Sequence, residues 1–158
     1  MTELSTCLWF AREAEEAARH YVRVVPGSTL GEVMMRPPEV PGPEGTVLMV
    51  AFTLAGAPML AFNGEPPPGF TNGISLVVSC AGQAELDRVW DGLLEGGGEP
   101  QACGWLKDRF GIAWQVVPEV LLRLMKAGDA AQRGRVMAAL MQMVKLDAAG
   151  LEAAFHAS

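Results

Sequence analysis

CGWLKDRFGIAWQVVP, residues 103–118, is the stretch of this chain that decides the fold. Two runs of apolar and aromatic residues flank a short segment, Asp108–Gly111, that begins with Asp and ends with Gly. Both residue types favour tight turns, and aromatic and β-branched residues favour strands. We therefore expect strands at Trp105–Lys107 and at 112–117 joined by this turn, with a short strand near 99–104 leading into them.

The residues before this hairpin predict a strand followed by a helix. Residues 73–80, GISLVVSC, are rich in strand formers, and apolar residues then recur at helical spacing over 83–95. The run Gly96–Gly98 is typical of a helix stop with a tight turn. The second half of the chain therefore has the expected order strand–helix–strand–strand–strand.

The first half repeats this order. Strands are expected at 4–10, 28–35, 46–54 and 58–63, a helix at 13–25, and Pro- and Gly-rich loops at 36–45 and 64–72. The apolar helix positions of the two halves match at one constant offset: Ala14, Ala17, Ala18, Tyr21 and Val22 with Leu86, Val89, Trp90, Leu93 and Leu94. The last hairpins also match, at a shorter offset, since the second half lacks the loop at 36–45.

The rest of the chain, 118–158, is expected to be helical. Pro118 stands where a helix start tolerates proline, and Asp129 and Asp147 can each cap a later helix. The expected inward-facing residues are Val120, Leu121, Leu124, Met125, Val136, Leu140, Met143, Val144, Leu151 and Phe155.

These elements predict an α+β fold of two paired βαβββ modules with C-terminal helices. We expect one domain over 1–117, with halves 1–64 and 70–117, and a helical extension at 118–158. Neither half can bury both faces of its sheet, so the halves are expected to pair and to create a cleft between them.

Composition excludes several classes of function. The chain has 158 residues, a formal net charge of −6 and no run of Lys and Arg, which argues against nucleic-acid binding. No apolar stretch reaches the roughly 18–20 residues that span a bilayer, and the N-terminus lacks a basic region typical of a signal peptide. We therefore expect no membrane partner and a cytoplasmic location. The odd number of cysteines, Cys7, Cys80 and Cys103, fits reduced and mostly buried thiols.

Six segments carry a resemblance to a known family. They are WFAREAEEAARHYV (9–22), FNGEPP (62–67), FTNGISLVVSC (70–80), QAELDRVWDGLLEGGG (83–98), CGWLKDRFGIAWQVVP (103–118) and AALMQMVKLDAAGLEAA (138–154). The chain resembles the vicinal oxygen chelate superfamily, which includes glyoxalase I and the bleomycin-resistance proteins. Within it, the details are similar to the 3-demethylubiquinone-9 3-methyltransferase-like family, also called PhnB-like.

The resemblance implies a glyoxalase-like fold and a divalent metal held by His and Glu from the first and last strands of each half. This sequence offers Cys7, Ser75 and Asn63 on those strands, and Gln115 where the resemblance places a glutamate. A neutral amide binds a transition metal far more weakly than a carboxylate or an imidazole. His20 and His156 are expected at the surface. We therefore predict no cofactor, with a divalent metal as the alternative.

The candidate ligand-binding residues lie on the predicted strands and the last turn. They are Cys7, Trp9, Phe62, Asn63, Ser75, Trp105, Lys107, Trp114 and Gln115. Gln115 has two interpretations: a core amide bonded to nearby backbone, or a donor that orients a polar ligand. Aromatic residues in strands are usually core, although one or more can line a site. Lys107–Arg109 is expected to be a solvated turn, with a cationic lip as the alternative, and Asn63–Gly64 to be a turn.

We expect a small-molecule binding protein or enzyme of the vicinal oxygen chelate type that works without the usual metal. The residues alone do not decide whether it is catalytic, because no arrangement of Ser, His and Asp stands out and Cys103 has no nearby base. One alternative is a metal-dependent lyase, isomerase or dioxygenase. The other is a non-catalytic interaction module, with the Met-rich stretch 137–143 covering a partner subunit. The resemblance implies a homodimer.

Overall fold

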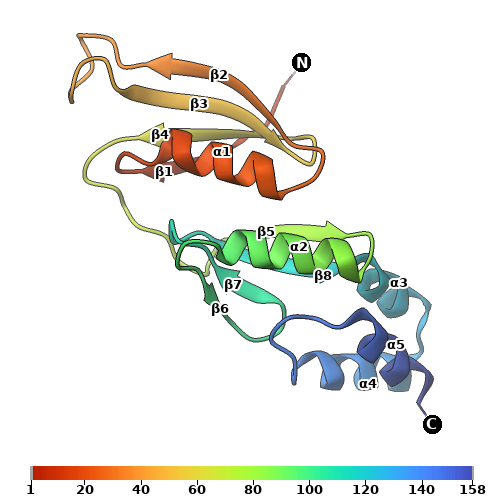
Figure 1. Cartoon of the computed structure of the whole chain (residues 1–158). Helices are drawn as coiled ribbons and strands as arrows, with labels where there is room; N and C mark the ends of the chain where they lie inside the picture. The colour runs from red at the N-terminus through yellow and green to blue at the C-terminus, as the bar shows by residue number, and fades with distance from the viewer. Residues whose placement is uncertain (1, 158) are drawn as a thin grey trace. The chain divides into compact units, whose positions relative to one another are not determined.

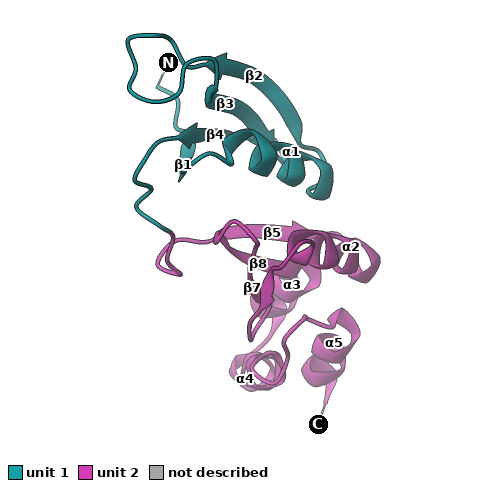
Figure 2. Cartoon of the chain, turned by 60° about the vertical axis from the view of Figure 1, so that its left-hand side comes forward, with its two compact units in different colours: residues 1–69 teal, residues 70–158 magenta. Residues whose placement is uncertain are grey.

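The computed structural model describes residues 2–157 and contains two compact units, which divide between Gly69 and Phe70 (Figures 1 and 2). Each unit has one mixed four-stranded sheet with a helix packed against one face. The predicted α+β class, with a repeated βαβββ order and helices at the C-terminal end, is confirmed.

The first unit contains β1 (Thr6–Phe10), α1 (Ala14–Val24), β2 (Thr29–Met35), β3 (Val47–Leu54) and β4 (Ala57–Asn63). The strand order is β1-β4-β3-β2, in which β1 runs parallel to β4 and the other pairs are antiparallel. Alternate strand residues point to opposite faces. Helix α1 covers the face of Leu8, Phe10, Val50, Phe52, Leu54, Met59, Ala61 and Asn63, all of which are buried.

The second unit contains β5 (Leu76–Cys80), α2 (Gln83–Leu94), β6 (Glu99–Pro100), β7 (Trp105–Lys107) and β8 (Ala113–Pro118). Its order, β5-β8-β7-β6, again has one parallel pair, β5 with β8, and the chain between these two strands forms α2, β6 and β7. Helix α2 covers the face of Cys80, Leu106, Trp114, Val116 and Pro118. Glycines end α2 as predicted, since the amides of Gly97 and Gly98 both donate to the Leu94 carbonyl.

The strand predicted near 99–104 is shorter, because the backbone after Pro100 turns away from the sheet. Cys103 has a φ of +63° and Gly104 a φ of +79°, and their amides donate to the carbonyls of Met143 and Val144. Position 104 also needs glycine, because a Cβ there would lie 2.9 Å from the Leu146 side chain. The C-terminal segment therefore takes the hydrogen bonds that a longer β6 would have made.

The C-terminal helices are α3 (Glu119–Ala127), α4 (Ala130–Leu140) and α5 (Ala148–His156), and they form part of the second unit. Both predicted caps are confirmed: Asp129 forms a capping box with Gln132, and the Asp147 side chain accepts from the Ala149 amide. The prediction for Val144 was wrong. It lies beyond the end of α4 and is exposed, whereas Leu146 takes the buried position.

Candidate functional site

The face of the second sheet opposite α2 carries four of the nine predicted ligand-binding residues. Gln115 on β8 is half-buried there, and its side-chain amide donates to the Ser75 hydroxyl at 2.9 Å. Trp105 lies directly opposite Gln115 in the β7–β8 register, and Lys107 is two residues further along β7 on the same face. An amide, a hydroxyl, an indole and an ammonium group therefore lie together on one surface.

The uncovered face continues into an apolar area. Val77 on β5 pairs in register with Gln115, and both Val77 and Ile74 are strongly exposed within this unit. The first interpretation of Gln115 expected its amide to bond to nearby backbone. In the structure this amide donates instead to the Ser75 side chain on the same surface. A few polar groups within an apolar lining are typical of small-molecule sites.

A similar surface lies on the uncovered face of the first sheet. Trp9 on β1 and Phe62 on β4 are register neighbours, and their rings meet edge to face with centroids 5.9 Å apart. The Trp9 indole donates to the Gly64 carbonyl at 2.9 Å, which fixes the ring over the end of β4. Trp9 keeps 40% of its surface exposed, and Cys7 is exposed on the same face.

Two predicted site residues, Asn63 and Trp114, lie on the helix-covered faces. Asn63 belongs to β4 and not to a turn; its side-chain oxygen accepts from the Ala14 amide at the start of α1, and its amino group donates to the Val47 carbonyl. Trp114 is fully buried, and its indole donates to Asp108 at 2.8 Å. Both side chains hold local structure together within their own units.

Sequence reasoning missed Asp108, which was expected in a solvated turn. The residue is only 4% exposed, and its carboxylate accepts from the amides of Phe110 and Ile112 as well as from Trp114. The spacing of Asp and Gly in DRFG is the signal that was available, since Asp commonly bonds to the backbone two residues ahead.

The two histidines differ in their exposure. His156 is exposed, as expected. The prediction for His20 was wrong, because it is only 4% exposed and lies between Arg23, 3.1 Å from its Nδ1, and the Tyr21 ring. His20 is buried on α1 together with the apolar residues Ala14, Ala17, Ala18 and Tyr21.

The three thiols are free, but the prediction that they are mostly buried was wrong. Cys7 is exposed, Cys103 is half-buried, and only Cys80 is fully buried. Burial raises the pKa of the Cys80 thiol to about 11, and partial burial also raises the pKa of Cys7. Both are therefore protonated near neutral pH, whereas metal binding and nucleophilic attack need the thiolate.

The residues on the uncovered faces do not fit the divalent metal that the family resemblance implies. Within residues 2–157, no group of three or more His, Cys, Asp and Glu side chains is arranged to hold a metal ion. The polar groups of these faces are a protonated thiol, a hydroxyl, a carboxamide, indoles and an ammonium group, none of which is a good ligand for such an ion. Also within the described residues, no helix has the length and apolar character needed to cross a membrane.

The comparisons with known proteins agree with this fold. A family model described as 3-demethylubiquinone-9 3-methyltransferase matches residues 2–117. Among solved structures, the PhnB protein from Bacillus cereus is 29% identical with a TM-score of 0.67, over 74% of this chain and 99% of that one. Protein PA1353 from Pseudomonas aeruginosa is 24% identical with a TM-score of 0.64, over 75% and 98%. The search of curated proteins found no match.

Proposed function

The chain belongs to the 3-demethylubiquinone-9 3-methyltransferase family, and from that premise we propose that it binds or converts a small molecule without the metal usual in vicinal oxygen chelate proteins. The observation that carries the proposal is the Gln115–Ser75 pair on the uncovered face of the second sheet. In this proposal the carboxamide takes the place of a metal-binding carboxylate and orients the ligand by hydrogen bonds.

The neighbouring side chains define the class of ligand. The Trp105 ring offers a flat apolar surface beside the carboxamide, and Lys107 offers a positive charge on the same face. We therefore expect a small planar molecule with a polar or anionic group. Trp9, Phe62 and Cys7 form a second apolar surface of the same kind on the first sheet.

Methyl transfer has no support from the glycine-rich segment. A doubly wound methyltransferase carries its glycine-rich cofactor turn between a strand and the following helix. Here Gly96–Gly98 ends α2 and leads into β6. The proposal therefore takes the family's fold and leaves the reaction in its name aside.

Ligand binding is tested by NMR with a library of small planar carboxylic acids and amides. The indole N–H signals are assigned by Trp→Phe variants. Binders should shift the Trp105 signal and leave Trp114 unchanged, because that indole is buried and bonded to Asp108. Gln115→Ala should weaken binding about tenfold, as expected for one lost hydrogen bond to a ligand. Gln142→Ala, at an exposed position in the tail, is the matched control.

The metal is tested separately, by elemental analysis of tag-free protein after incubation with Mn²⁺, Ni²⁺ or Zn²⁺. We expect no stoichiometric metal. One bound ion per chain would contradict the proposal and favour the alternative, a metal-dependent lyase, isomerase or dioxygenase. A library that shifts no indole signal would favour the non-catalytic interaction module.

We also propose that the protein acts as a homodimer in the cytoplasm. Met137 on α4 and Met141, the residue that follows the end of α4 and whose amide donates to the Met137 carbonyl, are 41% and 65% exposed. Leu122 on α3 is also exposed. Unbranched methionines are common at binding surfaces because they adapt to a partner. The dimer is tested by lysine substitutions at Met137 and Met141.

A further inference from the structure

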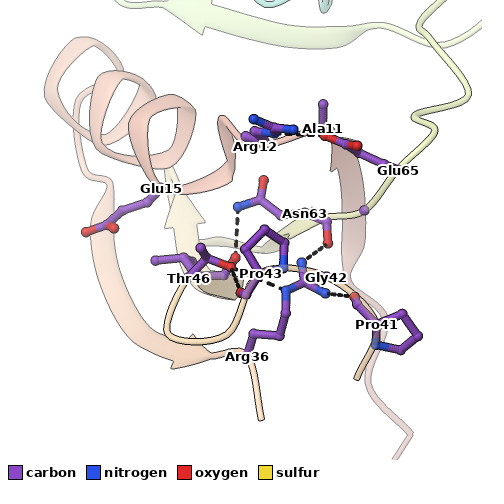
Figure 3. Close-up of a pocket in the computed structure, with 12 residues that line it drawn as sticks. Ala11, Arg12, Glu15, Arg36, Pro41, Gly42, Pro43, Thr46, Asn63 and Glu65 are labelled. Carbon is purple, nitrogen blue, oxygen red and sulfur yellow. Dashed lines mark hydrogen bonds and ion pairs between the residues drawn. The ribbon is translucent and has the colours of Figure 1, made fainter. Parts of the chain in front are cut away.

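The first unit contains a pocket of about 700 Å³ at the N-terminal end of α1, on the side of the proline-rich loop 36–46 (Figure 3). This volume is within the usual range for small-molecule sites, roughly 300–1,000 Å³. The lining residues come from the start of α1, the loop and the end of β4: Ala11, Arg12, Glu15, Arg36, Pro41, Gly42, Pro43, Thr46, Val47, Asn63, Gly64 and Glu65. The pocket shares none of the polar groups of the Gln115 surface.

Arg36 is the buried charge of this pocket, with 9% of its surface exposed. Its guanidinium donates to the carbonyls of Pro41 at 2.6 Å and Asn63 at 3.1 Å and to the Thr46 hydroxyl at 3.3 Å. All three acceptors are neutral. No carboxylate within residues 2–157 forms an ion pair with Arg36, so its positive charge is not compensated.

The other charged groups of the pocket are already paired. Arg12 and Glu65 form an ion pair at 2.8 Å, and Glu15 pairs with Arg19 at 2.7 Å. In Figure 3 the Arg12–Glu65 pair lies on the far side of Asn63 from Arg36. The remaining positive charge of the pocket is therefore that of Arg36.

The loop is built to hold this guanidinium in place. Gly42 has a φ of +127°, and a Cβ at that position would lie 2.9 Å from the Arg36 Cζ. The Arg36 amide also donates to the Thr46 carbonyl, which closes the base of the loop. Arginine has five N–H donors, of which three are used here, and two remain for a ligand.

We propose that this pocket is an oxyanion site in which Arg36 binds a carboxylate or phosphate group of a small ligand. A buried charge is costly unless it is paired, and an oxyanion supplies the missing partner. The planar guanidinium suits such groups because it can donate two N–H bonds to two oxygens. The N-terminal end of α1 adds a favourable dipole.

The test is a titration of the isotope-labelled full chain with inorganic phosphate and, separately, with acetate, at constant ionic strength set by chloride. We expect saturable shifts of the Arg36 Nε–H signal and of the Gly42 and Gly64 amides, with the Trp105 indole unchanged. That pattern separates this site from the Gln115 surface, so either proposal can fail alone. Saturation by phosphate only, or by acetate only, identifies the oxyanion that the pocket takes.

Three variants complete the experiment. Arg36→Lys keeps the charge but loses the planar fork, so the apparent Kd should rise about tenfold or more. Arg36→Gln should abolish the saturable shifts at Gly42 and Gly64. Arg133→Gln changes the net charge equally at an exposed position on α4 and should leave the titration unchanged.

Two results would overturn the proposal. One is a linear, non-saturating response of the wild-type Arg36 signal to both anions, which does not depend on any variant folding correctly. The other is an unchanged Kd in a folded Arg36→Gln variant, which would place the bound anion elsewhere.

Discussion

Asp108 shows how one side chain stabilises a hairpin in this fold. Its Oδ1 accepts from the amides of Phe110 and Ile112, and its Oδ2 accepts from the Trp114 indole. The turn is therefore tied both to its own backbone and to a fully buried ring on β8. The tip of the hairpin is in this way joined to the strand that carries Gln115.

We predict that Asp108→Ala lowers the free energy of unfolding by about 3 kcal/mol, because it leaves buried donors without an acceptor. Urea denaturation measures the change. Asp91→Ala is the control, since that carboxylate is exposed on α2 and its ion pair with Lys145 is at the surface. Its loss should be below about 0.5 kcal/mol. Equal losses in the two variants would contradict the role assigned to Asp108.

At the residue scale, the sequence indicated which side chains could act at a site, but it did not predict the burial or the hydrogen-bond partners of each one. Leu8 and Phe10 on β1 are buried whereas Cys7 and Trp9 are exposed. The sequence did not indicate which of these two faces the helix covers, because apolar residues occupy both. Asn63 and Asp108 are polar residues that bond to backbone amides, and such partners depend on the exact turn geometry. Arg36 was missed because its partners lie in a loop and at the end of another strand.

At the scale of elements, α2 and the C-terminal segment are joined by one side chain. The Gln83 amide donates to the Leu146 carbonyl at 3.0 Å, and its oxygen accepts from the Ala148 amide at 2.9 Å. Lys145 also forms an ion pair with Asp87 at 3.2 Å. The pKa of the Asp87 carboxyl is lowered mainly by the hydrogen bond from Gln83 and further by this contact with Lys145. These contacts fix the start of α5 against the start of α2.

We predict that Gln83→Ala weakens this junction by about 1–2 kcal/mol, because both backbone partners lose their bonds. Hydrogen exchange at the Ala148 amide should become faster by roughly tenfold, while amides within β3 should be unaffected. Gln101→Ala is the matched control, because that side chain bonds to the exposed Asn72 side chain. Unchanged exchange at Ala148 would show that apolar packing alone holds the segment.

Helical and strand periodicity predicted nearly every element of both units, because each has one buried and one uncovered face. The end of β6 was not predicted, since it depends on Met143 and Val144, which follow α4 and are distant in the sequence. Local sequence patterns contain no information about such distant partners. The same limit applies to the choice of Leu146 over Val144 for burial.

At the scale of the whole molecule, the two units repeat one topology and differ in the parts added to it. The first adds the loop 36–46 and its pocket, and the second adds three helices that lie outside the matched residues 2–117. The repeat was visible in the sequence because the apolar positions of its two helices match at one constant offset. The added parts were visible only as a proline-rich loop and a helical tail, because nothing in the other half corresponds to them.

The helical tail leaves apolar side chains uncovered, and the homodimer proposed above would bury them. A stable interface buries about 800 Å² per partner, and the side chains at its centre are removed from water. A charge introduced at the centre should therefore strongly disfavour association. We predict that the double variant Met137→Lys, Met141→Lys converts the dimer to a monomer without unfolding the chain, since both residues are exposed.

Light scattering after size exclusion gives the mass, and circular dichroism verifies the fold. The double variant Ala131→Lys, Ala153→Lys adds the same charge at exposed positions on α4 and α5 and should remain dimeric. A monomeric wild-type protein would contradict the dimer, and a dimer that tolerates both methionine substitutions would place its interface elsewhere.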